Sequence, residues 1–195
     1  REIQEYVNKI NSISFPRQGH SSNVGLIENN QEIYALKRTM GELNCALLNR
    51  EVTVLNCLTQ KTKLPIPKVK SFVEQVSEKE SWALIEFLEG ETVRAALYNE
   101  KSKGKRHEII YNFGNILRQI HSTPCPSELI SERPWLDEKL CQAELNLKKY
   151  HGDGTGELLG KIKYFKPKEY PQTLIHGDFT IDNVLVKNGV ITGVI

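Results

Sequence analysis

Short apolar runs separated by polar turns fill much of the N-terminal half of the chain, a pattern typical of antiparallel strands. Four of these runs have the length and residue types of strands, at residues 24–27, 33–36, 69–76 and 81–88. Between the second and third runs, residues 41–60 place apolar side chains at helical spacing without a proline. The pattern therefore predicts a small antiparallel sheet with one amphipathic helix.

Further along the chain the spacing becomes helical. Residues 107–121 carry their apolar side chains on one face of a helix, and Pro134 suits the first turn of another helix that runs to about Tyr150. Strands and helices do not alternate as they do in a doubly wound fold, so we expect an α+β chain of two lobes. Residues 1–88 would form the N-terminal lobe and residues 89–195 the mainly helical lobe.

Near its end the chain returns to strands, which enclose a polar loop. The apolar residues 174–175 predict a short strand that leads into His176, Gly177 and Asp178, and Asn183 follows five residues after the aspartate. This arrangement suits phosphoryl transfer, in which a carboxylate orients the attacking hydroxyl and a nearby side-chain oxygen binds Mg²⁺. We expect His176 to pack and hydrogen-bond the loop rather than to transfer protons.

The sequence after this loop distinguishes it from a second His-Gly-Asp. Apolar residues 184–186 run into Asn188 and Gly189, a strong hairpin signal because both central positions of a type I′ turn need positive φ. Residues 190–195 are the returning strand. The other His-Gly-Asp, at residues 151–153, has neither a preceding apolar strand nor the asparagine, so we interpret it as a flexible loop.

The segment from His176 to Ile195 resembles the catalytic loop and hairpin of the aminoglycoside phosphotransferase and choline kinase group, small-molecule kinases with the protein-kinase fold. The resemblance makes Asp178 the catalytic aspartate and Asn183 a metal ligand, and it puts a second metal-binding aspartate immediately after Ile195. It implies ATP and Mg²⁺ as cofactors. The implied acceptor is a hydroxyl of a small molecule, such as an aminoglycoside-like antibiotic, choline, a sugar or an amino alcohol.

Lys37 and Glu51 extend the resemblance into the N-terminal lobe. Lys37 ends the strand predicted at 33–36, which matches the kinase lysine that reaches the α- and β-phosphates. Glu51 lies near the middle of the predicted helix, where the glutamate that pairs with this lysine belongs. Glu42 is its competitor, but the helix dipole already accounts for a carboxylate in the first turn.

Two further segments of the resemblance would contact the nucleotide. The polar loop at residues 19–25 lacks the GxGxxG of protein kinases, but its backbone amides and the hydroxyls of Ser21 and Ser22 are candidates to bind phosphate oxygens. The strand that precedes the next glycine turn resembles the hinge between kinase lobes. There the Glu86 carbonyl and the Leu88 amide would bind adenine.

Composition narrows the possible partners. With 39% hydrophobic and 26% charged residues, the chain is an ordinary globular protein. A net charge of +2 argues against nucleic acid as a partner. The dense basic run at residues 101–107 lacks aromatic residues, and we interpret it as a solvated loop before a helix. Composition and spacing carry no signal for the oligomeric state.

The apolar runs and the cysteines indicate the compartment. No apolar run approaches the roughly 18 to 20 residues that span a bilayer, and residues 1–20 contain no signal-peptide core, so we expect no membrane partner and a cytoplasmic location. The four cysteines have no CxxC spacing, and three lie in apolar helical patterns, which predicts buried thiols in a reducing compartment. Because the first residue is Arg1 rather than Met, we expect the natural chain to begin earlier.

Two alternatives to the small-molecule kinase stay open. A non-catalytic nucleotide-binding protein with a kinase-like fold would keep the hinge and Lys37 but lose the second metal aspartate. A protein kinase is less favoured, because His-Gly-Asp replaces the His-Arg-Asp of that class.

Overall fold

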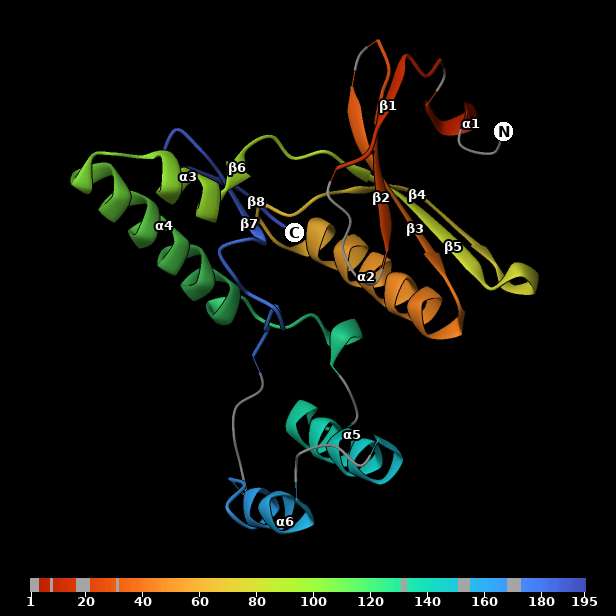
Figure 1. Ribbon diagram of the computed structural model, residues 1–195, viewed down its shortest axis with the longest axis vertical. Helices are drawn as coiled ribbons and strands as arrows, with labels where there is room; N and C mark the ends of the chain where they lie inside the picture. Colours follow the sequence, from red (N-terminus) through yellow and green to blue (C-terminus); the bar gives the residue numbers. More distant parts are fainter. Residues whose placement is uncertain are drawn as a thin grey trace. The chain divides into compact units, whose positions relative to one another are not determined.

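The computed structural model describes residues 4–7, 9–16, 22–30, 32–130, 133–150, 155–167 and 173–195. The chain forms two compact units (Figure 1). Unit 1 comprises Arg1–Thr123 and Ile175–Ile195, and unit 2 comprises Pro124–Leu174. The lobe boundary expected at residue 88 lies inside unit 1 and stays a prediction.

A five-stranded sheet dominates the N-terminal part of unit 1, with every neighbouring pair antiparallel and the strand order β1-β2-β3-β5-β4. The strands are β1 (Ser12–Ser14), β2 (Asn23–Glu28), β3 (Ile33–Met40), β4 (Val69–Gln75) and β5 (Glu80–Glu86). The four predicted strands are confirmed. The pattern did not predict β1, because this edge strand is only three residues long and is exposed throughout.

Helices cover both faces of this sheet. On one face lies α2 (Glu42–Lys61), as predicted (Figure 1), and its Leu48 and Val52 pack against Ala83 and Ile85 of β5. On the other face Leu84 joins a second cluster that includes the last residue of α1 (Gln4–Val7). Successive strand residues point to opposite faces, so burial on both sides explains why residues 83–85 are apolar without alternation.

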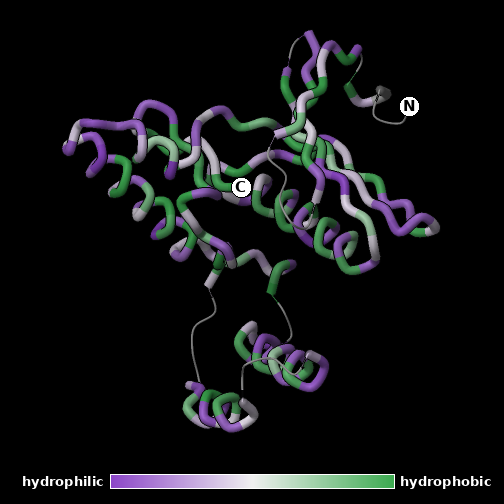
Figure 2. The backbone as a smooth tube through the Cα atoms, in the orientation of Figure 1, coloured by the Kyte–Doolittle hydropathy of each residue, from purple (hydrophilic) through white to green (hydrophobic). Residues whose placement is uncertain are grey.

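A smaller three-stranded sheet and two helices form the rest of unit 1. Its strands pair in the order β6-β7-β8, all antiparallel. The elements are β6 (Glu91–Thr92), α3 (Val93–Asn99), α4 (Lys103–Ser122), β7 (Val184–Lys187) and β8 (Val190–Val194). The predicted hairpin turn is confirmed, since Asn188 has φ 52° and Gly189 has φ 80°. Figure 2 shows hydrophobic and hydrophilic stretches alternating along α4, as in a helix that buries one face.

Two local predictions are wrong. The basic run is not a loop, because α4 already begins at Lys103, where the Ser102 hydroxyl accepts a hydrogen bond from the Lys105 amide (3.5 Å). Serine is a preferred N-cap and lysine a good helix former, which together favour this early start. Residues 174–175 are not a strand either, since β7 pairs with β6 and β8 instead, and Ile175 is 42% exposed.

The cysteines only partly match their prediction. All four are free thiols, and Cys45 of α2 is buried. Cys57 and Cys125 are half-buried, whereas Cys141 is exposed. The last thiol is accessible because α5, which carries it, buries none of its residues in the described structure.

Unit 2 consists of α5 (Trp135–Tyr150) and α6 (Gly156–Tyr164), preceded by the 3₁₀ turn η2 (Ser127–Leu129). The prediction of α5 is confirmed, and α6 is new. An ion pair between Lys163 and Glu144 (2.6 Å) joins the two helices.

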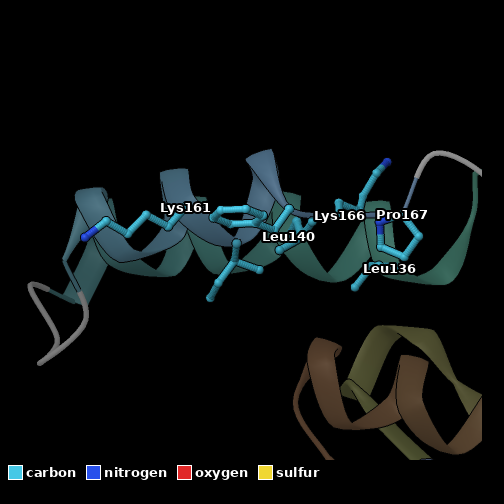
Figure 3. A pocket seen from close by; sticks show the side chains of 7 residues that line it. Leu136, Leu140, Lys161, Lys166 and Pro167 are labelled. Atoms are coloured by element: carbon cyan, nitrogen blue, oxygen red, sulfur yellow. The ribbon is translucent and has the colours of Figure 1, made fainter.

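A mainly apolar groove of about 360 Å³ lies between these helices, and Figure 3 shows Lys161 and Lys166 near its opposite ends. No predicted site residue lines this groove. The second His-Gly-Asp, at residues 151–153, lies outside the described residues. Within the described ranges, every helix is too short or too polar to cross a membrane.

Candidate active site

Asp178 and Asn183 lie side by side in the loop that precedes β7. The Asn183 amide nitrogen Nδ2 donates to the Asp178 carboxylate Oδ2 (2.9 Å) and to the Asp178 backbone oxygen (2.8 Å). Both donors of this amide are thus used, which leaves its carbonyl oxygen Oδ1 as the atom that can face a cation. The structure therefore brings the predicted aspartate and asparagine together as one oxygen-rich pair.

The backbone of the loop presents Asp178 outward. Gly177 has φ 89°, a left-handed conformation that a side chain would strain. The next amide, that of Asp178, donates to Nδ1 of His176 (3.3 Å), which matches the expected structural role of this histidine. The Asp178 side chain itself is exposed, so an acceptor molecule can reach it.

An aromatic contact anchors the loop to α4. Phe179 stacks on Phe113 with ring centroids 4.7 Å apart, and it meets His176 edge to face at 5.9 Å. Sequence analysis placed Phe113 on the buried helix face but could not identify its partner. The only local signal was an aromatic residue inside an otherwise polar loop.

Arg94 of α3 holds the other end of the loop. Its guanidinium Nε and Nη2 donate to the two carboxylate oxygens of Asp182, at 2.6 and 2.8 Å, and its backbone amide donates to the Ile181 oxygen (3.0 Å). The hydrogen bonds from Arg94 hold the pKa of the Asp182 carboxyl below its ordinary value. Sequence analysis missed this contact, although Thr92 is a recognisable N-cap that could have predicted α3.

Lys37 pairs with Glu51 rather than with another helix glutamate. Its Nζ lies 2.5 Å from Glu51 Oε1, and the side chains are 27% and 39% exposed. Glu42 instead forms an ion pair with Lys79 (2.7 Å). Lys37 does not end its strand as predicted but lies inside β3, facing Val24 and Ala83 of the neighbouring strands, because pairing with β5 continues to Met40.

The residues predicted to bind phosphate are only partly described. Ser21 lies outside the described residues, as does the start of its loop. Ser22 is half-buried and directly precedes β2, in which Val24 is the strand partner of Lys37. The register thus puts Ser22 two residues from the partner of the lysine.

The two predicted hinge residues contact different parts of the chain. Glu86 is the last residue of β5, and its amide donates to the Lys68 oxygen (2.8 Å). Leu88 lies beyond the strand and packs closely on β8, since a Cβ at Gly193 would come within 2.8 Å of Leu88 Cδ1. Within the described chain the Leu88 amide has no hydrogen-bond acceptor, which an adenine-binding amide requires.

Strand β8 and the residue after it contact three separate segments of unit 1. The Val194 amide donates to the backbone oxygen of Pro65 in the connector after α2 (2.8 Å), and the Ile195 amide donates to the backbone oxygen of Asn183 (2.9 Å). The Thr192 hydroxyl donates to the Glu89 oxygen (2.6 Å). These contacts link the loop that carries Asp178 and Asn183 to the segments that follow α2 and β5.

The donor atoms suit a hard cation. Asp178 and Asn183 offer oxygen ligands, which Mg²⁺ prefers. No group of three or more His, Cys, Asp or Glu residues comes together in the part of the chain that the structure describes. A magnesium ion held here would therefore take its other ligands from nucleotide phosphates and water.

Comparison with known proteins identifies the family of this chain and its fold. The model of the phosphotransferase enzyme family matches residues 12–195. No curated protein matches the chain. Among solved structures, the aminoglycoside phosphotransferase APH(4)-Ia is 19% identical with a TM-score of 0.69, and the match covers 100% of this chain and 68% of that chain. A thermostable mutant of that enzyme was solved with ADP and hygromycin B.

Two other solved structures have the same fold. One is the GDP and kanamycin complex of an APH(2″) enzyme, with TM-score 0.65, 16% identity and coverage of 98% of this chain and 69% of that chain. The other is a candidate fructosamine-3-kinase from Haemophilus somnus, with TM-score 0.64, 16% identity and coverage of 98% and 68%. These likenesses confirm the predicted α+β protein-kinase-like fold. Since the family model matches nearly the entire sequence, the chain belongs to the phosphotransferase enzyme family.

Proposed function

We propose that this protein is an ATP-dependent phosphotransferase that transfers the γ-phosphate to a hydroxyl group of a small molecule. The observation that carries the proposal is the pair formed by Asp178 and Asn183, in which the asparagine Nδ2 lies 2.9 Å from the aspartate Oδ2. In a member of the phosphotransferase family, this pair combines a candidate base for the acceptor hydroxyl with a candidate metal ligand, two of the groups that phosphoryl transfer uses.

Each group has a defined task in this proposal. The exposed Asp178 carboxylate accepts a hydrogen bond from the acceptor hydroxyl, orients its oxygen toward the γ-phosphorus and takes up its proton. The Asn183 carbonyl oxygen would hold Mg²⁺, which supplies charge neutralisation on the phosphates when it is bound. Lys37 donates to the α- and β-phosphate oxygens, and its contact with Glu51 keeps the ammonium in place.

The nucleotide would lie between the lysine and the hinge. We assign adenine to the Glu86 carbonyl and the Leu88 amide, and phosphate oxygens to the backbone and hydroxyls of Ser21 and Ser22. The Leu88 amide, which has no hydrogen-bond acceptor within the described chain, supports the first assignment. The assignment of phosphate to the serine loop is supported by the position of Ser22, two residues before Val24, the strand partner of Lys37.

The acceptor is proposed only as a chemical class. Similar solved structures contain hygromycin B and kanamycin, both aminoglycosides, and another is a candidate fructosamine-3-kinase. We therefore include aminoglycoside-like antibiotics, choline, sugars and amino alcohols, with a cytoplasmic location where ATP is available. Nucleic acid and membranes are not proposed as partners.

Replacement of Asp178 tests the reaction. We expect Asp178→Asn to lower the rate of ATP-dependent phosphorylation by roughly 10²- to 10⁴-fold, because a general base contributes about that much. Nucleotide binding, followed by calorimetry with ATP or GTP, should survive. The assay is ADP release by the complete gene product with a panel of hydroxyl compounds, and Glu78→Gln, an exposed carboxylate outside the site, is the control.

Two outcomes would contradict the proposal. Full turnover in Asp178→Asn would remove this residue from the mechanism. ATP binding without ADP release for any acceptor would favour the alternative, a non-catalytic nucleotide-binding protein with a kinase-like fold.

A further inference from the structure

The corner of the catalytic loop at Ile181 and Asp182 is held by a residue far away in sequence. Arg94 makes three hydrogen bonds to this corner: two from its guanidinium to the Asp182 carboxylate and one from its amide to the Ile181 oxygen. A guanidinium that binds both oxygens of a carboxylate fixes the orientation of the carboxylate as well as its distance. Both the position of the corner and the orientation of the Asp182 carboxylate are therefore fixed.

The base of this contact is rigid. Thr92 pairs with Leu185 of β7, and its hydroxyl caps α3 by accepting a hydrogen bond from the Ala95 amide (3.2 Å). Val93, immediately before Arg94, is completely buried. Strand pairing, cap and core packing thus fix the backbone from which the guanidinium reaches the loop.

The contact is adjacent to the reacting groups. Asp182 directly precedes Asn183, whose amide bonds to Asp178. A rotation of the Asp182 backbone would turn the Asn183 side chain and break its contact with Asp178. The position of both proposed catalytic groups consequently depends on this corner.

Global stability does not account for the contact. The side chains of Arg94 and Asp182 are 62% and 49% exposed, and ion pairs this exposed contribute little to folding. A bidentate contact of low energetic value beside the catalytic pair is expected of a group that orients the loop.

We propose that Arg94 is a positioning residue for phosphate transfer, which acts through Asp182 to hold Asn183 and Asp178 in reacting geometry. This inference rests on the proposed function. It adds a residue from α3 to a reaction otherwise assigned to the catalytic loop and to the Lys37–Glu51 pair.

Steady-state kinetics with ATP and the best acceptor test the proposal. We expect Arg94→Gln and Asp182→Asn each to lower kcat by roughly 10- to 100-fold, because small misplacement of reacting groups has effects of this size. The KM for ATP should change less than about threefold, since neither residue is assigned to the nucleotide. Arg94→Lys should also lower kcat to nearly the same extent, because lysine lacks the planar guanidinium that binds both oxygens of the carboxylate.

Three further measurements separate positioning from general structure. The double variant Arg94→Gln/Asp182→Asn should be no slower than either single variant, because both changes remove one interaction. Hydrogen exchange at the amides of residues 181–183 should be faster in Arg94→Gln, while its Tm falls by no more than about 2–4 °C. Lys79→Gln, which breaks an exposed ion pair with Glu42 away from the loop, should leave kcat unchanged.

The outcomes distinguish this inference from the proposed function. If the unmutated protein transfers no phosphate, the proposed function fails, and the role of Arg94 in it fails too. If the protein is active but Arg94→Gln keeps its kcat, only the inference is overturned. A loss of kcat matched by an equal loss of folded protein would also overturn it, because it would indicate a structural role.

Discussion

Lys37 and Glu51 are 14 residues apart in the sequence and meet on the face of the N-terminal sheet that α2 covers. Lys37 lies inside β3, where hydrogen bonds to β2 and β5 fix its backbone, and Glu51 lies near the middle of α2. Both side chains are partly exposed, so solvent screens their attraction. We therefore expect the pair to fix the position of the Lys37 ammonium group rather than to stabilise the fold.

The first prediction concerns this pair. Glu51→Gln should raise the KM for ATP by about 5- to 10-fold, because the unanchored lysine must be ordered when the phosphates bind. The free energy of unfolding should fall by less than about 1 kcal/mol, since the pair is partly exposed. ADP release at varied ATP concentrations and urea unfolding measure the two effects.

Glu42→Gln is the matched control, because it removes a carboxylate of the same helix that pairs with Lys79 instead. Its KM for ATP should equal that of the unmutated protein. An unchanged KM in Glu51→Gln, or an equal rise in both variants, would contradict the assignment of Glu51.

At the scale of elements, the close approach of β8 to the segment after β5 joins the hairpin to the hinge. Gly193 of β8 makes this approach possible, since an added Cβ would lie 2.8 Å from Leu88 Cδ1 and 3.2 Å from both Leu88 Cβ and Leu185 Cδ1. Real Cβ atoms do not approach other atoms so closely, so the neighbours would have to move. The hairpin that follows Asn183 can therefore pack against Leu88 only because residue 193 is a glycine.

The second prediction follows from this packing. Gly193→Ala should lower the free energy of unfolding by about 1–3 kcal/mol, as overpacking in a close contact does. Because Leu88 must shift, nucleotide affinity should fall too if its amide binds adenine. Urea unfolding and calorimetry with ATP measure these effects.

Gly114→Ala in α4 serves as the opposite case. It has nothing within 4 Å of an added Cβ, and alanine favours a helix interior over glycine by about 0.5–1 kcal/mol. This variant should therefore be more stable than the unmutated protein. A neutral Gly193→Ala would show that Leu88 can move without cost.

At the scale of the whole molecule, an ion pair at the start of β5 makes the stability of the fold depend on pH. Arg38 of β3 pairs with Glu80, which is only 7% exposed, and the guanidinium lies 5.6 Å from the ring centroid of Trp82. The hydrogen bond from Arg38 lowers the pKa of Glu80 below its ordinary value of 4.5. The folded state therefore binds this proton less readily than the unfolded state does.

The third prediction concerns acid stability. A carboxyl with a lowered pKa in the folded state stabilises the fold above its unfolded pKa and loses this effect as pH falls through the folded pKa. Glu80→Gln should thus be less stable than the unmutated protein at pH 7. The difference should shrink as pH falls below about 4.5, the ordinary pKa of the group.

Urea unfolding at several pH values measures this difference. Glu78→Gln, a change at an exposed glutamate in the 3₁₀ turn η1 (Val76–Glu78), is the control and should track the unmutated protein at every pH. A gap between Glu80→Gln and the unmutated protein that stays constant with pH would exclude the ion pair as its cause.

The sequence by itself determined the elements whose signal is local. The helical spacing of residues 41–60 and 107–121 predicted α2 and α4, and the positive φ required at Asn188 and Gly189 predicted the hairpin. The pairing of Asp178 with Asn183 was recognisable for the same reason, since their spacing is short. Such signals reflect backbone geometry over a few residues, which sequence spacing records.

Only the tertiary structure decided which distant residues meet. Arg94 and Asp182 are 88 residues apart, and no local spacing relates them. The partner of Phe179 on α4 and the close approach of Leu88 to Gly193 were equally invisible. These contacts depend on how strands pair and helices pack, and packing brings together side chains whose separation along the chain carries no periodic signal.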